Sequence, residues 1–249
     1  MITVANEGFV AVVEIDNPPN NHVSVTLIQE LAQTFEILDE DESVRAILLC
    51  STGKNFCAGA DFSAPREGQL VVGDLYVQAV RLFATKKPIV AAVQGAAVGA
   101  GLGLAVMADF RVAATDARFA ANFVKLAFHP GFGLTHTLPR LIGTQRASLM
   151  FLTGRRIKAD EALAWGLADA VTEPEALRAG ALAMATEIAE NAPLAVQSTR
   201  KTMRGDLAAA VKAQTAHEQK EQTWLRATED FAEGVKAVGE RRPGNFKGR

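Results

Sequence analysis

The sequence predicts an α/β fold followed by a helical C-terminal part. Before Glu173, short apolar runs typical of buried strands alternate with segments of helical spacing. This alternation favours parallel strands joined by helices. From Glu173 onward the strand signal disappears, so about 75 residues at the C-terminus are expected to be helical. No linker, internal repeat or low-complexity tract divides the chain.

The elements of the predicted sheet region follow one another at short intervals. Residues 9–15 have the alternation of a strand and end at the turn Asn17-Pro18-Pro19. Residues 46–50 form a buried-strand pattern, and residues 89–93 form another. Residues 75–83 read as a helix that leads to the second of these strands. A further helix over residues 26–38 is predicted from the spacing of its apolar residues, which are Leu27, Leu31, Phe35 and Leu38.

The C-terminal part shows helical spacing in two places. In each of them the apolar or small residues return every three or four positions, which places them on one face of a helix. The first set is Leu177, Ala181, Met184 and Ile188, and the second is Leu207, Ala208, Val211 and Thr215.

Composition is that of an ordinary globular protein. The chain has 249 residues, of which 49% are hydrophobic and 22% charged, and this length is ample for a buried core. The net charge of −2 and the lack of a basic stripe argue against nucleic acid as a partner. The N-terminus lacks a basic region followed by a long apolar run, so no secretory signal is expected.

Cysteine and serine residues suggest no special chemistry. Cys50 and Cys57 make neither a disulfide framework nor a metal site, which favours a reducing compartment, and we expect a cytoplasmic protein. A nucleophilic triad has no clear support, because Ser24 and Ser51 lack a recognisable neighbouring base. Cys57 would need stabilisation of its thiolate, for which the sequence gives no sign.

Residues 88–109, PIVAAVQGAAVGAGLGLAVMAD, are the most informative stretch. A buried-strand pattern leads through a turn at Gln94-Gly95 into a run where Gly99, Gly101 and Gly103 alternate with Ala and Leu. Glycines at a strand-to-helix junction let another group approach the backbone closely. The first turn of the following helix has unpaired N–H groups and a partial positive charge. This arrangement predicts a cradle for a negatively charged oxygen.

Three other interpretations of this stretch compete. A membrane span is long enough to be possible, but the residues are mostly Ala, Gly and Val, and Gln94 interrupts them. A dinucleotide-binding loop would need a third glycine where Leu104 stands. A tightly packed core helix, with glycines used only for close contact, stays open.

Together with a second stretch, residues 53–62, this one resembles the crotonase superfamily, the enoyl-CoA hydratase/isomerase family. Four motifs in order carry the resemblance, which covers nearly all of the chain. They are Asn17-Pro18-Pro19 with Asn21, Phe56 to Asp61 (FCAGAD), Lys87 to Asp109, and Thr153 to Leu167.

The resemblance implies a crotonase-like ββα spiral core over residues 1–190 and a C-terminal helical region over residues 191–249. In the family, the C-terminal helices mediate contacts of a homotrimer or of a dimer of trimers. The substrate would be an acyl-CoA thioester, with coenzyme A as part of the substrate and no separate cofactor. Two backbone N–H groups would stabilise the thioester enolate, and by resemblance they belong to Ala60 and Ala100. Asp61 would support the loop rather than react.

The acid–base residues depart from the family pattern. Enoyl-CoA hydratases use two glutamates, and the matching positions here are Gly103 and Phe123. Some isomerases, and the dehalogenase branch at about the same place, use an aspartate where this chain has Gly131. His129, in a loop that borders the acyl pocket in the family, is the candidate substitute, because histidine is the usual general base near neutral pH. A structural role for this histidine is the competing interpretation.

Other residues are expected to bind the substrate. By resemblance the backbone of Ala58 lies near the adenine, His22 near the thiol arm of CoA, and Arg241 near the nucleotide, where a solvated basic tail is the alternative. Phe123 joins the substrate-binding residues, since it cannot transfer a proton. We expect an enzyme that binds acyl-CoA and catalyses isomerisation, decarboxylation, hydrolysis or weak hydration. The alternative is a non-catalytic acyl-CoA-binding or assembly protein.

Overall fold

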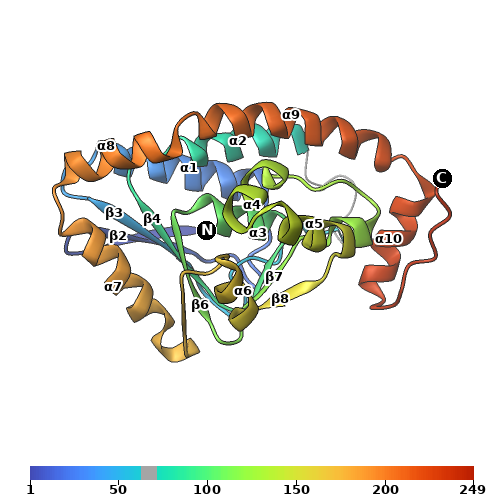
Figure 1. Cartoon of the computed structure of the whole chain (residues 1–249), viewed down its shortest axis with the longest axis horizontal. Coiled ribbons are helices and arrows are strands. Elements are labelled where there is room, and N and C mark those ends of the chain that lie inside the picture. The colour runs from blue at the N-terminus through green and yellow to red at the C-terminus, as the bar shows by residue number, and fades with distance from the viewer. Residues whose placement is uncertain (63–71) are drawn as a thin grey trace.

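The computed structural model describes residues 1–62 and 72–249. Strands and helices alternate up to β9, and helices follow from there to the C-terminus (Figure 1). In chain order the elements are β1 (Ile2–Glu7), β2 (Val10–Ile15), α1 (Val25–Glu40), β3 (Ala46–Ser51), α2 (Val72–Phe83), β4 (Ile89–Val93), β5 (Ala96–Val98), α3 (Ala100–Met107), β6 (Phe110–Ala114), β7 (Arg118–Ala120), η2 (Asn122–Leu126), α4 (Leu134–Ile142), α5 (Thr144–Thr153), β8 (Arg156–Lys158), α6 (Ala159–Trp165), β9 (Ala170–Thr172), η3 (Pro174–Ala176), α7 (Leu177–Ala189), α8 (Pro193–Arg204), α9 (Leu207–Leu225) and α10 (Glu229–Gly239).

The described strands form two sheets. The larger has the order β1-β2-β3-β4-β6-β9, and the smaller has the order β5-β7-β8. Pairs from β2 to β9 are parallel, as the sequence predicted. However, β1 runs antiparallel to β2, and β8 antiparallel to β7. Strand β1 was not predicted, because this edge strand is mostly exposed and lacks a buried face to set an alternation of apolar residues.

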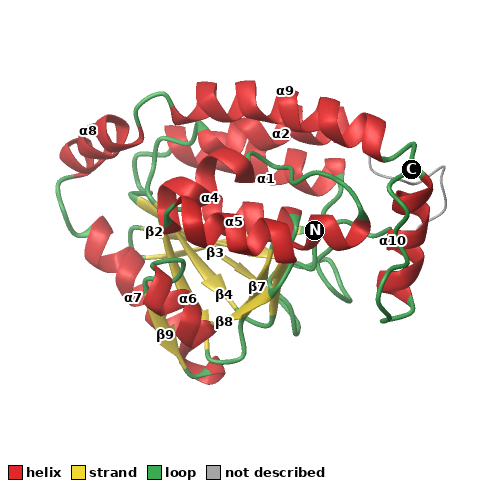
Figure 2. Ribbon diagram, turned by 45° about the vertical axis from the view of Figure 1, so that its right-hand side comes forward, coloured by secondary structure: helices red, strands yellow, loops and turns green. Residues whose placement is uncertain are grey.

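Alternation along the strands divides the core in two. In β2, Ala11, Val13 and Ile15 face the helices α1 and α2, whereas Val10 and Val12 face α7. Successive side chains of a strand point to opposite faces, so a sheet covered on both sides gives continuous apolar runs. Figure 2 shows the larger sheet between these two helical layers. The predicted strands and helices of this region are confirmed.

The two motif stretches meet at the smaller sheet. Cys57 N–H donates to Ala96 O at 2.9 Å, and Val98 N–H donates to Cys57 O at 3.1 Å. A Cβ on Gly101 would lie 2.1 Å from Cys57 O, so only glycine lets α3 pack this closely. Sheet pairing and a small residue therefore fix the loop before Ala60 against the start of α3.

The C-terminal helices extend over the core. Helix α9 runs beside α2 and α4, with α10 at the end of the molecule where the C-terminus lies (Figure 1). Both predicted helical faces are confirmed in α7 and α9, where Leu177, Ala181, Val211 and Thr215 are buried. Trimerisation through these helices and the boundary at residue 190 stay predictions. In the described ranges, no helix is long and apolar enough to cross a membrane.

Candidate active site

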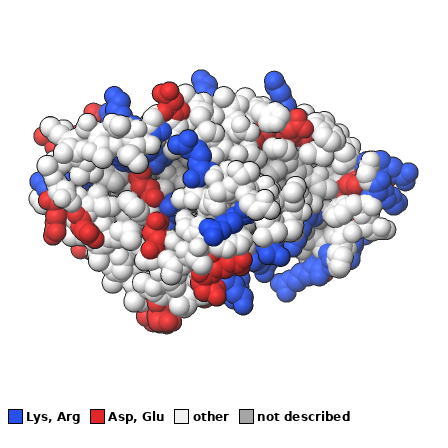
Figure 3. Space-filling view, viewed as in Figure 1, with Lys and Arg blue, Asp and Glu red and all other residues white. Residues whose placement is uncertain are grey.

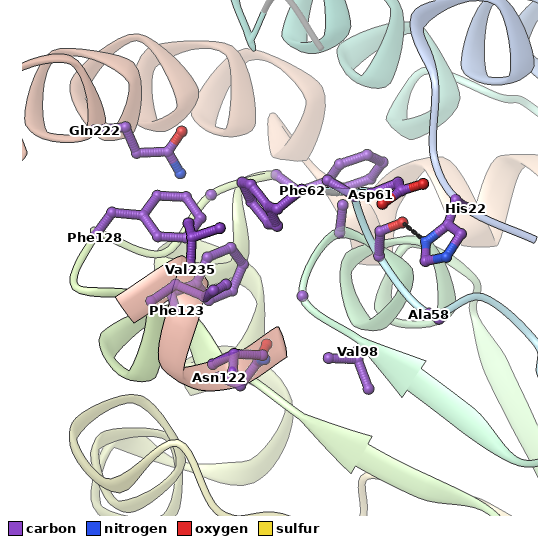
Figure 4. Close-up of a pocket in the computed structure, with 18 of the residues that line it drawn as sticks. His22, Ala58, Asp61, Phe62, Val98, Asn122, Phe123, Phe128, Gln222 and Val235 are labelled. Atoms are coloured by element: carbon purple, nitrogen blue, oxygen red, sulfur yellow. Dashed lines mark hydrogen bonds between the residues drawn. The ribbon is translucent and has the colours of Figure 1, made fainter. Parts of the chain in front are cut away.

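A cavity of about 330 Å³ opens between the two motif stretches and the C-terminal helices. Its lining comes from the loop at Ala58 to Phe62, from Val98 to Ala100, from η2 and from residues of α9 and α10. Most of the lining is apolar, and polar side chains such as His22 and Gln222 come from different sides of it. In Figure 4, His22 and Asp61 lie on one side of the cavity and Phe123 and Phe128 on the other.

Two backbone N–H groups face each other at this cavity. Ala60 follows the loop Ala58-Gly59, and Ala100 is the first residue of α3. Among the described residues, neither N–H donates a hydrogen bond to a described acceptor. A Cβ on Gly59 would lie 3.8 Å from Ala100 N, which shows how closely the two segments approach. Unpaired donors at a helix N-terminus form a site for negative charge.

The loop that carries Ala60 is held in place by backbone geometry and an amide anchor. Gly59 has φ +85°, and a Cβ there would lie 2.6 Å from Val98 O, so a side chain is excluded on both grounds. Asn21 Nδ2 donates to Thr52 O and to Asn55 O, each at 2.8 Å. These bonds connect the early loop to the strand end before the cavity. The N–H of Ala60 is therefore preorganised rather than free to reorient.

His22 is the imidazole among the described lining residues. Its Nδ1 lies 3.1 Å from Gly59 O, as the dashed line in Figure 4 marks. A carbonyl accepts, so this contact places a proton on Nδ1 and leaves Nε2 as the acceptor in the neutral ring. His22 thus braces the loop beside Ala60.

Phenylalanines line the opposite wall. The rings of Phe123 and Phe128 meet edge to face with centroids 5.4 Å apart, and Phe62 meets Phe128 at 5.7 Å. Gly103 lies behind this wall: a Cβ there would be 2.5 Å from Phe132 Cδ1. The position where the sequence predicts the loss of a glutamate is therefore covered by a packed ring. A carboxylate at Gly103 would have to displace Phe132.

A buried hydrogen-bond network closes the cavity near α9. Tyr76 Oη donates to Gln222 Oε1 at 3.2 Å, and Gln222 Nε2 donates to His129 O at 2.8 Å. Burial raises the pKa of Tyr76 well above its ordinary value, so the phenol stays protonated. A Cβ on Gly131 would lie 1.8 Å from Tyr76 Oη. The third position where the family can place an acid is thus filled by this tyrosine.

The predicted site residues separate into two groups. Ala58, Ala60, Ala100, His22 and Phe123 all line the cavity, and the structure brings them together. The other two predicted residues, His129 and Arg241, are not among the described residues that line it.

His129 lines a neighbouring cavity with Thr135 and Trp224, and its Nδ1 lies 2.7 Å from Pro130 O. This geometry gives no support to His129 as the base. Arg241 is exposed just beyond α10, with φ +56°. Burial raises the pKa of the Cys57 thiol to about 12, which excludes it as a nucleophile at neutral pH.

Three lining residues were missed by sequence reasoning: Tyr76, Gln222 and Arg226. They come from α2 and from the end of α9, elements that the periodicity predicted as ordinary amphipathic helices. Helical periodicity does not distinguish a polar residue that faces solvent from one that lines a cavity. The one available signal was a glutamine within a face otherwise expected to pack, at Gln222.

Comparison with known proteins gives consistent results. A family model described as enoyl-CoA hydratase/isomerase matches residues 5–249. The chain is 34% identical over 248 residues to a short-chain-enoyl-CoA hydratase of Clostridium acetobutylicum, covering 97% of this chain and 95% of that one. It is 34% identical over 252 residues to the 2,3-dehydroadipyl-CoA hydratase of Escherichia coli, and the match covers 100% of this chain and 99% of that one. An enoyl-CoA hydratase/isomerase structure from Pseudoalteromonas atlantica superposes with TM-score 0.88 at 30% identity, covering 99% of both chains.

Proposed function

The chain belongs to the enoyl-CoA hydratase/isomerase family of the crotonase superfamily, and from that premise we propose that it is an enzyme that stabilises the enolate of an acyl-CoA thioester. The thioester oxygen would lie between the N–H groups of Ala60 and Ala100. Charge develops on this oxygen when the α-carbon loses a proton or a substituent. Preorganised donors then act with little reorganisation, in a cavity whose apolar lining strengthens each hydrogen bond.

One observation carries this proposal. Two unpaired N–H groups from separate segments converge on one apolar cavity, and glycines at Gly59 and Gly101 are required for that approach. Both N–H groups belong to half-buried residues without a described acceptor, and a ligand in the cavity can supply one. A thioester oxygen supplies it.

The acid–base chemistry of this chain departs from two-glutamate hydration. We infer that Gly103 and Phe123 stand where hydratases of the family have their glutamates. Among the described residues that line the cavity, Asp61 is the carboxylate and His22 the imidazole. Isomerisation, decarboxylation and weak hydration pass through the thioester enolate, and thioester hydrolysis passes through a tetrahedral oxyanion, so each of them develops negative charge on the same oxygen. No further cofactor is needed, since CoA arrives with the substrate.

The CoA moiety would lie along the side of the cavity that contains Ala58 and His22. We propose that the backbone of Ala58 meets the adenine, with His22 near the thiol arm. Arg241 would contact the nucleotide phosphates, because guanidinium groups match phosphate geometry. Lys and Arg side chains gather at the end of the molecule where the C-terminus lies (Figure 3), which supports anion binding there. A homotrimer, or a dimer of trimers, in the cytoplasm completes the proposal.

A panel of acyl-CoA thioesters tests this function. Each member is measured both for equilibrium binding by calorimetry and for turnover by mass spectrometry. We expect binding of several members and turnover of at least one. Failure of every acyl-CoA to bind would contradict the proposal.

A second candidate is a non-catalytic acyl-CoA-binding protein. The observation that favours it is the lining itself, in which the described residues include no glutamate. Binding across the panel with no turnover of any member would support this candidate over the enzyme.

A further inference from the structure

Arg226 is a half-buried cation that forms no ion pair with a described side chain. It follows the last residue of α9 and lines the cavity that also contains Ala60 and Ala100. Its Nε is buried and has no hydrogen-bond partner. Among the described residues, the side chain of Arg226 takes part in no ion pair and in no hydrogen bond.

The surroundings of this guanidinium are aromatic. Its Cζ lies 5.6, 5.7 and 6.0 Å from the ring centroids of Phe231, Phe128 and Phe62. Ring faces attract a cation but do not satisfy its N–H donors. Burial lowers the pKa of Arg226, yet an arginine keeps its charge in proteins. Its Nε–H group therefore remains available for an acceptor.

Three other arginines of the described chain, whose side chains have little solvent exposure, each have a carboxylate partner. Arg111 Nη2 lies 3.1 Å from Asp169 Oδ2, and Arg200 and Arg204 each lie 2.8 Å from a carboxylate oxygen of Asp109. A buried charge is costly unless it is paired. Arg226 differs from these arginines, and it lines a cavity in which a ligand can supply the carboxylate.

We propose that the cavity accepts an acyl group that carries a second carboxylate at the end remote from the thioester. Arg226 binds that carboxylate, and the substrate class is the mono-CoA thioester of a dicarboxylic acid. This inference rests on the proposed function, in which the thioester oxygen lies at Ala60 and Ala100. Apolar lining residues that include Leu126 and Val235 face the methylene groups between the two ends. The rings around Arg226 exclude water, which strengthens its bond to a carboxylate.

The test compares two thioesters of equal chain length, adipyl-CoA and hexanoyl-CoA, by calorimetric binding to the full chain. Adipyl-CoA has a carboxylate where hexanoyl-CoA has a methyl group. We expect the wild-type protein to bind adipyl-CoA about 10- to 100-fold more tightly, the range for hydrogen bonds to charged groups. Arg226→Met should abolish this preference, and Arg226→Lys should retain part of it. Arg146→Met is the matched control, because Arg146 also lies over a ring, that of Trp165 at 5.8 Å, but outside the cavity.

The outcomes separate the two claims. If hexanoyl-CoA binds as tightly as adipyl-CoA to the wild-type protein, the carboxylate site is disproved while acyl-CoA binding stands. If both bind but Arg226→Met keeps the preference, the role of Arg226 is disproved. If neither thioester binds, this inference fails, and the panel of acyl-CoA thioesters decides the proposed function separately. The wild-type comparison needs no variant, so poor folding of Arg226→Met would leave the test valid.

Discussion

The two sides of the cavity are built by different means. On one side the chemistry resides in backbone N–H groups, and the residues there are the small ones Gly59, Ala60, Gly99 and Ala100. On the other side it resides in side chains, with phenylalanines around a single guanidinium, that of Arg226. The first side comes from the sheet-bearing core, and the second comes largely from η2, α9 and α10.

This difference separates activity from selectivity. Backbone donors are fixed by strand pairing and by the space that glycine leaves, so they hold one geometry whatever the substrate's tail. A wall of side chains changes with single substitutions. We infer that the cradle sets the reaction type as enolate chemistry and that the wall selects the acyl group. Each prediction below acts on one side alone.

Removal of a cradle donor should have the largest effect. Ala100→Pro deletes one N–H at the first position of α3, where proline suits helix geometry. Loss of one oxyanion donor typically removes about 3 kcal/mol of transition-state stabilisation, which lowers turnover by ~10²-fold. The measurement is turnover of any acyl-CoA that the panel shows to be a substrate, with circular dichroism to check folding.

Thr144→Pro provides the matched control, because Thr144 is the first residue of α5 and does not line the cavity. Ala60→Pro tests the second donor in the same way. Unchanged turnover in well-folded Ala100→Pro and Ala60→Pro proteins would show that neither N–H stabilises the reacting oxygen.

Hydration should be slow in the wild-type protein. On the proposal that Gly103 and Phe123 stand at the glutamate positions, hydration of crotonyl-CoA should fall at least ~10²-fold below that of a two-glutamate hydratase, the contribution of one acid–base group. The decrease in enoyl absorbance measures it, with a two-glutamate family member assayed in parallel. Rapid hydration that persists in both His22→Gln and His129→Gln would overturn this view of the acid positions.

A side chain at Gly103 should destabilise the wall rather than the cradle. The Cβ of Gly103→Ala would lie 2.5 and 2.8 Å from Phe132 Cδ1 and Cβ. Overpacking of a core typically costs about 1–3 kcal/mol, which chemical denaturation measures. Gly239→Ala is the control, since a Cβ there meets nothing within 4 Å. Equal stability of the two variants would mean that Phe132 yields easily, so that Gly103 is not a packing position.

Loss of the Tyr76 hydroxyl should have a smaller effect. Tyr76→Phe leaves Gln222 Oε1 without its donor at 3.2 Å, and a buried hydrogen bond contributes about 1 kcal/mol of unfolding free energy. Thr202→Val removes an exposed hydroxyl and should change stability less. A loss of turnover in Tyr76→Phe without a loss of stability would instead give the phenol a catalytic role.

His129 should have the smallest effect of all. Its ring lines the neighbouring cavity, so His129→Gln should leave turnover unchanged on any substrate of the panel. A ~10²-fold drop with acyl-CoA affinity retained would contradict this and restore His129 as general base.

The close approach of the two motif segments could be predicted from sequence, whereas the opposite wall of the cavity could not. Glycines at fixed spacing after a buried strand encode a close backbone approach, which the structure confirms at Gly59 and Gly101, while the role of Ala60 and Ala100 as donors stays a prediction. Hydrophobic periodicity likewise placed β2, β3 and β4 of the larger sheet, but it did not place β1, β6 or β9. The exposed edge strand β1 escaped because neither of its faces forms the core.

The wall, which is the side of the cavity that contains the phenylalanines and Arg226, depends on how helices far apart in the sequence pack together. Arg226 and Tyr76 come from elements that only tertiary packing brings to the cavity, and no local pattern reports such a meeting. His129 illustrates the converse. It lies in the loop between two lining segments, and Gly131, two residues further on, lines the cavity while His129 does not. Position in a loop therefore predicts the neighbourhood of a site but not the direction of a side chain.

Vibrational spectroscopy of a bound thioester tests the central claim most directly, because it requires binding but no turnover. A thioester labelled with ¹³C at the carbonyl gives an infrared band that moves to lower wavenumber as the oxygen gains hydrogen-bond donors. The account predicts that the band of bound butyryl-CoA lies below its position in water, and that Ala100→Pro moves it back toward that position while Thr144→Pro does not. A bound band at the position in water, the same in both variants, would contradict a cradle formed by Ala60 and Ala100.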